Sequence, residues 1–201
     1  MTIILTTTAL ISIFSFFFYK TIHHYRYVFY GMVAILALIY GGEEANIVSM
    51  GYVPFGVFIV VMFSGVMDKG TLRKRLFMVR AELAVIGTIL LFPHALGYLE
   101  YYLDDIGLFG GGISFYFGLL AAVIVIPLFV TSFQFIRKHM GYKKWKKLHQ
   151  LSYVFYLSIG LHLILIQNQR MWLYILLFGM YFILKLVTYY AYKMKNRKTN
   201  N

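Results

Sequence analysis

The sequence contains no cysteine. Disulfides, thiol relays, iron–sulfur clusters, covalently attached c-type haem and thiolate metal sites are therefore excluded. Charged residues are also scarce, at 13% of 201 residues against 61% hydrophobic residues. A soluble domain is about one quarter charged, so this chain has too few charges to cover a water-facing surface of its size. The composition indicates an integral membrane protein, in which any redox chemistry must use histidine or a bound organic cofactor.

Acidic residues are scarcer than basic ones. The chain has 7 Asp and Glu against 19 Lys and Arg, which gives a formal net charge of +12. The basic residues lie in clusters between apolar stretches, a distribution typical of cytoplasmic loops that contact anionic lipid. We therefore expect membrane lipid, and no nucleic acid, among the partners of this protein.

Apolar sequence is abundant and falls into seven stretches. They cover roughly residues 2–19, 28–42, 51–67, 83–99, 113–133, 149–166 and 171–190. A membrane-spanning helix needs about 20 residues, so seven spans leave no room for a separate soluble domain. The sequence predicts an all-α integral membrane protein of about seven transmembrane helices, in a single domain over residues 1–201.

The loops between these stretches alternate in charge. Basic loops follow the first, third and fifth stretches, whereas acidic loops follow the second and fourth. The basic loops carry Lys20 and Arg26, then Lys69, Arg73, Lys74, Arg75 and Arg80, then Arg137, Lys138, Lys143, Lys144, Lys146 and Lys147; the acidic loops carry Glu43 and Glu44, then Glu100, Asp104 and Asp105. The positive-inside rule predicts a multi-pass cell-membrane protein with its N-terminus outside and its C-terminus in the cytoplasm. The first stretch lacks a basic n-region and a cleavage site, so we expect a retained helix.

Two histidines lie inside predicted spans that run in the same direction. His94 is 14 residues from Arg80 at the inner end of the fourth span, and His162 is 13 residues from His149 at the inner end of the sixth. At 1.5 Å per residue both lie about 20 Å from the inner end, in the outer leaflet. One imidazole from each of two helices is the arrangement that axial ligation of a haem iron requires. The residues alone also allow the alternative that each histidine only hydrogen-bonds a neighbouring helix.

The inner ends of the same two helices do not offer a matching pair of ligands. His149 has no second histidine at its depth, because Arg80 occupies the corresponding position. Arginine suits haem propionates, a flavin phosphate or lipid better than iron. On an ideal helix His149 and His162 lie about 140° apart, so a stacked pair of sites needs a rotation or a distortion. The remaining histidines, His23, His24 and His139, lie in basic loops and are interpreted as lipid headgroup contacts.

One segment carries a family resemblance. Residues 137–165, RKHMGYKKWKKLHQLSYVFYLSIGLHLIL, resemble the ferric-reductase-like transmembrane domain, with Trp145, Leu148, His149 and His162 on its pattern. The resemblance is closest to the bacterial YedZ/MsrQ branch. It implies a six-helix haem-binding core over residues 28–192, an extra N-terminal helix and loop over 1–27, and a basic cytoplasmic tail over 193–201.

The resemblance also implies a function. It predicts a b-type haem protein that carries electrons outward, with His94 and His162 as the outer haem ligands and His149 as the inner histidine. Because Arg80 replaces the family's fourth histidine, the number of haems is left at one or two, and FMN or FAD at the cytoplasmic side is the other expected cofactor. The donor is expected to be a separate cytoplasmic flavin reductase or a membrane quinol. The acceptor is expected to be an extracytoplasmic reductase subunit, a flavoprotein or ferric iron.

Two other functions stay open from the residues. One is a quinol-linked cytochrome b subunit of a respiratory complex. The other is a haem-free transporter or scaffold, in which the histidines only join helices. A transporter more often shows internal repeats or paired broken helices, and the sequence shows no convincing repeat.

Overall fold

The computed structural model of this protein describes residues 1–41, 48–67, 70–106, 110–166 and 170–199, and helices are the only regular elements among them. The helices are α1 (Thr2–His24), α2 (Arg26–Gly41), α3 (Tyr52–Ser64), α4 (Thr71–Met78), α5 (Arg80–Tyr101), the π-helix η1 (Tyr102–Ile106), α6 (Ile113–Ser132), α7 (Gln134–Met140), α8 (Tyr142–Leu148), α9 (Leu151–Ile166) and α10 (Met171–Thr199). The predicted all-α class is confirmed.

All seven predicted apolar stretches contain a helix. Within the described ranges, five helical segments are long and apolar enough to cross a membrane: Thr2–His24, Arg80–Asp104, Ile113–Ser132, Tyr142–Ile166 and Met171–Ala191. The other two stretches form α2 and α3, which are apolar but only 16 and 13 residues long. The protein is therefore a multi-pass membrane protein in which two apolar helices are shorter than the about 20 residues of a full span.

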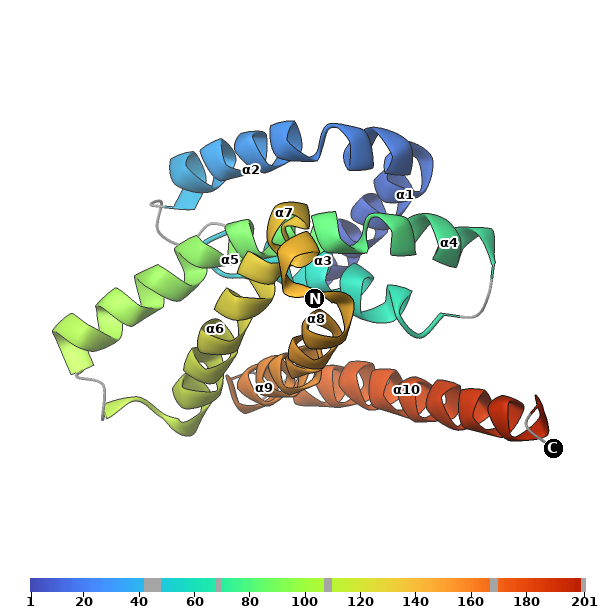
Figure 1. Ribbon diagram of the computed structural model, residues 1–201. Helices are drawn as coiled ribbons and strands as arrows, with labels where there is room; N and C mark the ends of the chain where they lie inside the picture. Colours follow the sequence, from blue (N-terminus) through green and yellow to red (C-terminus); the bar gives the residue numbers. More distant parts are fainter. Residues whose placement is uncertain (42–47, 68–69, 107–109, 167–169, 200–201) are drawn as a thin grey trace.

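The short helix α3 lies in the interior of the bundle. Ten of its 13 residues are buried, and it packs against α1 and α5. In Figure 1 it lies near the centre, with the other helices around it. A helix that is apolar on every side must be covered on every side, so α3 is the element around which the longer helices gather.

The first helix packs directly on this central helix. Thr8 Oγ1 in α1 donates a hydrogen bond to the Gly56 carbonyl in α3, at 3.2 Å. A Cβ atom at Gly56 would lie 2.9 Å from the Thr7 side chain, so only glycine allows this approach. Ile4 is 1% exposed and belongs to the main apolar core. Helix α1 is therefore an integral part of the bundle.

The last helix is longer than predicted. Helix α10 continues to Thr199, nine residues beyond the predicted span, so the predicted tail at 193–201 is helical as far as Thr199. Tyr174, Phe178 and Tyr181 are buried along one face of α10, which packs against α9. The C-terminal half of α10 extends away from the other helices (Figure 1).

The sixth predicted span begins two residues later than expected, and a short helix precedes it. We expected one helix from His149, but α8 ends at Leu148, His149 and Gln150 form a turn, and α9 begins at Leu151. The turn carries His149 on the C-cap of α8 (φ −68°, ψ −5°). His149 and His162 are therefore not on one regular helix, and the 140° separation calculated for an ideal helix does not apply to them.

Candidate cofactor sites

The two intramembrane histidines lie side by side. His94 in α5 and His162 in α9 are 68 residues apart in the chain, and their ring centres are 6.4 Å apart with an angle of 77° between the ring planes. Helix α6 packs against both α5 and α9. The structure thus brings together the two histidines that the sequence predicted at equal depth.

Each of these histidines is oriented by one backbone carbonyl. His94 Nδ1 donates to the Ser49 carbonyl and His162 Nδ1 donates to the Ser114 carbonyl, both at 2.8 Å. A carbonyl oxygen only accepts, so the proton of each neutral ring is on Nδ1 and the lone pair is on Nε2. Neither Nε2 has a hydrogen-bond partner among the described residues. Histidines that bind metals are oriented in the same way, with the second nitrogen bonded to a carbonyl or a carboxylate.

A glycine lies against each ring. A Cβ atom at Gly51 would lie 3.2 Å from the His94 ring, and one at Gly118 would lie 2.9 Å from the His162 ring. Gly51 also has φ +76°, a left-handed conformation that favours glycine. Each imidazole therefore has a carbonyl bonded to Nδ1 and a glycine backbone close to its Nδ1 and Cε1 atoms.

The geometry of this pair fits a haem iron. An imidazole nitrogen bonds a transition metal at about 2 Å, so two imidazoles on opposite sides of one iron have ring centres about 6 Å apart. The observed separation is 6.4 Å. The donor set, two neutral imidazoles and no thiolate, is that of a b-type haem.

The two predicted inner-site residues line one cavity. Its volume is about 350 Å³, within the range of about 300–1,000 Å³ that is usual for ligand pockets. Arg80 and His149 line it together with two more cations, Arg137 and Lys146, and none of the described residues that line it carries a carboxylate. Aromatic and polar side chains complete the wall, among them Phe77, Phe129, Trp145, Gln150, Tyr153 and Tyr156. The cavity therefore suits a flat group that carries negative charge.

His149 itself is held by α6 and α8. Its Nε2 lies 3.0 Å from Thr131 Oγ1, and the Trp145 ring centre lies 4.3 Å from its own. Trp145 Nε1 donates to the Thr131 carbonyl at 3.1 Å, which fixes α8 to the end of α6. In the described part of the chain no group of three or more His, Cys, Asp or Glu side chains is placed to hold a metal. The inner cavity thus offers one imidazole and several cations.

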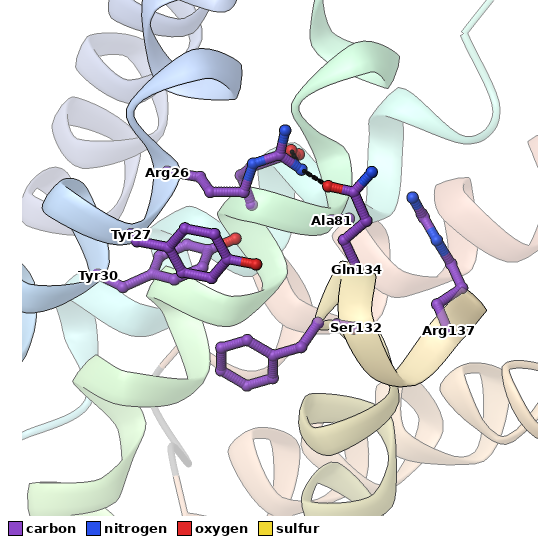
Figure 2. A pocket seen from close by; sticks show the side chains of 9 residues that line it. Arg26, Tyr27, Tyr30, Ala81, Ser132, Gln134 and Arg137 are labelled. Carbon is purple, nitrogen blue, oxygen red and sulfur yellow. Dashed lines mark hydrogen bonds and ion pairs between the residues drawn. The ribbon is translucent and has the colours of Figure 1, made fainter. Parts of the chain in front are cut away.

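A buried carboxylate near this cavity was missed by the sequence reasoning. Glu82, at the start of α5, is 3% exposed, and its Oε1 lies 2.8 Å from His23 Nδ1 and 3.6 Å from the Arg26 guanidinium. Figure 2 shows Arg26 reaching the side chain of Gln134, to which it donates a hydrogen bond of 2.9 Å. His23 is therefore not a headgroup contact alone. No local pattern signals this pairing, because His23 and Glu82 are 59 residues apart.

The fold and these sites define a class of protein: a multi-pass, all-α membrane protein with paired intramembrane histidines. Residues 45–160, more than half of the chain, match the family of the ferric reductase like transmembrane component. The chain belongs to this family. The matched range includes Arg80, His94 and His149 and ends two residues before His162. Membership points to a role in electron transfer within the membrane.

Two curated relatives are similar to parts of the chain. An uncharacterized protein from Treponema pallidum is 35% identical over 113 residues, which cover 53% of this chain and 31% of the relative. The magnetosome protein MamZ from Paramagnetospirillum magneticum is 43% identical over 53 residues, 26% of this chain and 8% of the relative. The matched segments thus cover less than a third of either relative. No solved structure matches the chain.

Proposed function

We propose that this protein binds haem b between His94 and His162 and carries electrons across the membrane to an acceptor outside. The observation that carries the proposal is the pair of imidazoles, 6.4 Å apart, each with Nδ1 bonded to a carbonyl. Bound there, the haem would supply a one-electron redox centre in an apolar environment. The chain's own residues orient the two rings, fix their tautomers and leave the Nε2 lone pairs for the iron.

One observation favours the haem-free alternative. The bonds from His94 to Ser49 and from His162 to Ser114 join segments distant in sequence, as a scaffold would require. This alternative uses Nδ1 only, and it gives no reason for two Nε2 atoms that have no partner in the described ranges or for glycines against both rings. The haem proposal accounts for the Nδ1 bonds, for the two available Nε2 atoms and for the glycines.

The test is a reduced-minus-oxidised visible spectrum of the purified protein, with haem quantified per chain. His94→Ala and His162→Ala should each abolish the bands of the outer haem. His139→Ala is the matched control, because His139 also bonds a carbonyl through Nδ1, that of Phe135 at 2.8 Å, but is exposed. Full haem content in the His94→Ala/His162→Ala double variant would show that the ligand assignment is wrong. No bands in the wild-type protein, after expression with ample haem, would leave the scaffold function.

We further propose that the inner cavity binds an anionic redox group beside His149. The candidates are the phosphate of FMN or FAD, or the propionates of a second haem, and the support is the cluster of Arg80, Arg137 and Lys146 without a carboxylate. Arg80→Ala should lower the content of that group several-fold, whereas Lys144→Ala, at an exposed position of the same basic loop, should not. Two haems per chain would identify a second haem; one haem with one flavin would identify the flavin. An unchanged cofactor content in Arg80→Ala would show that Arg80 only sets the topology.

The donor and the acceptor are part of the proposal. A cytoplasmic flavin reductase or a membrane quinol would reduce the inner site, and a reductase subunit, a flavoprotein or ferric iron would accept the electrons outside. Similarity to the YedZ/MsrQ branch stays a prediction. Rapid reduction by a quinol, with no response to a flavin reductase and NADH, would identify the membrane quinol as the donor. Co-purification of a cofactor-bearing subunit on the outer side would favour the quinol-linked cytochrome b alternative.

A further inference from the structure

Glu82 is an unusual group to find in the interior of a membrane protein. Its side chain is 4% exposed, yet only one of its carboxylate oxygens is paired: Oε1 meets His23 and Arg26, and Oε2 has no hydrogen-bond partner among the described residues. Burying a polar atom that has no hydrogen-bond partner is energetically unfavourable. Such groups in a membrane protein are rare and commonly belong to ion or proton paths.

The carboxylate lies in a small polar pocket. The pocket has a volume of about 10 Å³, near the minimum of about 10–15 Å³ that one water molecule needs. The charged and titratable side chains around it come from three helices: His23 of α1, Arg26, Tyr27 and Tyr30 of α2, and Arg137 of α7. Gln134 and Ser132 supply the other polar groups (Figure 2).

This pocket adjoins the inner cavity. Ala81, Ser132 and Arg137 line both of them, so a single layer of side chains separates Glu82 from the inner cofactor site. Ser132 is a hydroxyl at this boundary, 9% exposed and bonded to the Leu128 carbonyl at 2.7 Å. On the other side the His23 side chain is 46% exposed. Glu82 therefore stands between the cavity and the exterior surface, and His23, its hydrogen-bonded neighbour, reaches that surface.

From this arrangement we propose that Glu82 and His23 form a proton path between the inner cavity and cytoplasmic water. The inference rests on the proposed function, because it assigns the electron donor in that cavity to one chemical class: a hydroquinone or a reduced flavin, which loses protons with its electrons. Oxidation of one donor molecule would release two protons and two electrons, which would reduce two ferric haem irons, or one iron in two successive turnovers, to the ferrous state. Each proton binds the Glu82 carboxylate, moves to His23, and is released to water.

The test compares donors that carry protons with one that does not. Haem reduction is followed by stopped-flow absorbance with menadiol, with reduced FMN, and with dithionite, which delivers electrons without a hydrogen atom. His23→Ala should slow reduction by the proton-carrying donor at least about tenfold, and by up to the about 10²–10⁴-fold that a positioned acid–base group typically contributes. Imidazole added to the buffer should restore that rate, and the dithionite rate should not change. Slowing only with menadiol would identify a hydroquinone, and slowing only with FMN a flavin.

Matched variants separate a proton path from a structural tie. Glu82→Gln keeps the size of the side chain and should be slow without rescue by imidazole. Two control variants should react at the wild-type rate. His24→Ala removes the exposed histidine next to His23, and Glu100→Gln neutralises an exposed carboxylate elsewhere on α5. If Glu82→Gln does not fold, the comparison of His23→Ala with and without imidazole still tests the proton path. Wild-type rates in His23→Ala with full haem content, or a slow rate that imidazole does not restore, would overturn the proposal.

An infrared measurement without any electron donor tests the proton path separately from the proposed haem function. At low pH the buried Glu82 should give a protonated-carboxyl band that is absent in Glu82→Gln. Its shift on transfer to D₂O should be slower in His23→Ala than in wild type, whether or not haem is bound. An equal exchange rate in the two proteins would overturn the proton path, whereas missing haem bands with the expected exchange would overturn only the proposed function.

Discussion

Single glycines set how closely the backbone approaches the two histidines that we assign to the outer haem. Gly118 in α6 faces the tip of the His162 ring, and Gly51 precedes α3 and faces His94. The sequence predicted the histidine pair because equal spacing from the inner helix ends is readable along the chain. It did not predict the glycines, since a contact between α6 and α9 exists only once the helices have packed.

Gly118→Ala should disturb the haem site while the protein stays folded. The added Cβ would lie 2.9 Å from Cε1 and Nδ1 of His162, so the ring must turn away from the Ser114 carbonyl. We expect a lower haem content and altered low-spin signals in the electron paramagnetic resonance spectrum. Gly97→Ala is the control, because Gly97 lies on the same helix as His94 with nothing within 4 Å of its added Cβ. Equal spectra for the two variants would contradict the role of Gly118.

At the scale of helices, the apolar stretches predicted most elements to within a few residues, because a membrane helix must be continuously apolar. Helix α8 and the turn after it escaped prediction, because the basic run up to Lys147 is interpreted as a loop and the segment from Leu148 to Leu151 contains neither glycine nor proline, the usual signals of a turn. The stacking of Trp145 on His149 and the bond from His149 to Thr131 accompany the turn. These are tertiary contacts, which a local pattern does not contain.

The contact between α2 and α5 depends on one glycine against one proline. A Cβ at Gly41 would lie 2.6 Å from Pro93 Cβ, too close for any side chain. Gly41→Ala should therefore push α2 away from α5, beside His94, and destabilise the protein by about 1–3 kcal/mol, the usual cost of overpacking. Thermal unfolding in detergent measures the effect. In the same helix Gly31 has nothing within 4 Å, so Gly31→Ala should be neutral or stabilising by up to about 1 kcal/mol. Destabilisation of equal size in both variants would contradict the packing argument.

At the scale of the whole molecule, the direction of electron flow depends on the orientation in the membrane. The structure places Arg80, Arg137 and Lys146 around one cavity, which agrees with one basic end of the bundle. Loop charges predict that this end is cytoplasmic and that the loop from Glu100 to Asp105 is outside. Helix packing alone is the same for either orientation, so the topology needs its own measurement.

The absence of cysteine makes that measurement direct, because a single introduced thiol is the only one in the chain. Asp104→Cys and Lys144→Cys place thiols at exposed positions of the predicted outer and inner ends. A membrane-impermeant maleimide should label Asp104→Cys in intact cells and Lys144→Cys only in inverted vesicles or after lysis. The cysteine-free wild type gives the background, and labelling after lysis shows that both thiols react. The opposite pattern would reverse the proposed electron path, because the cavity with Arg80 and His149 would then face outward and His94 and His162 would lie nearer the cytoplasm.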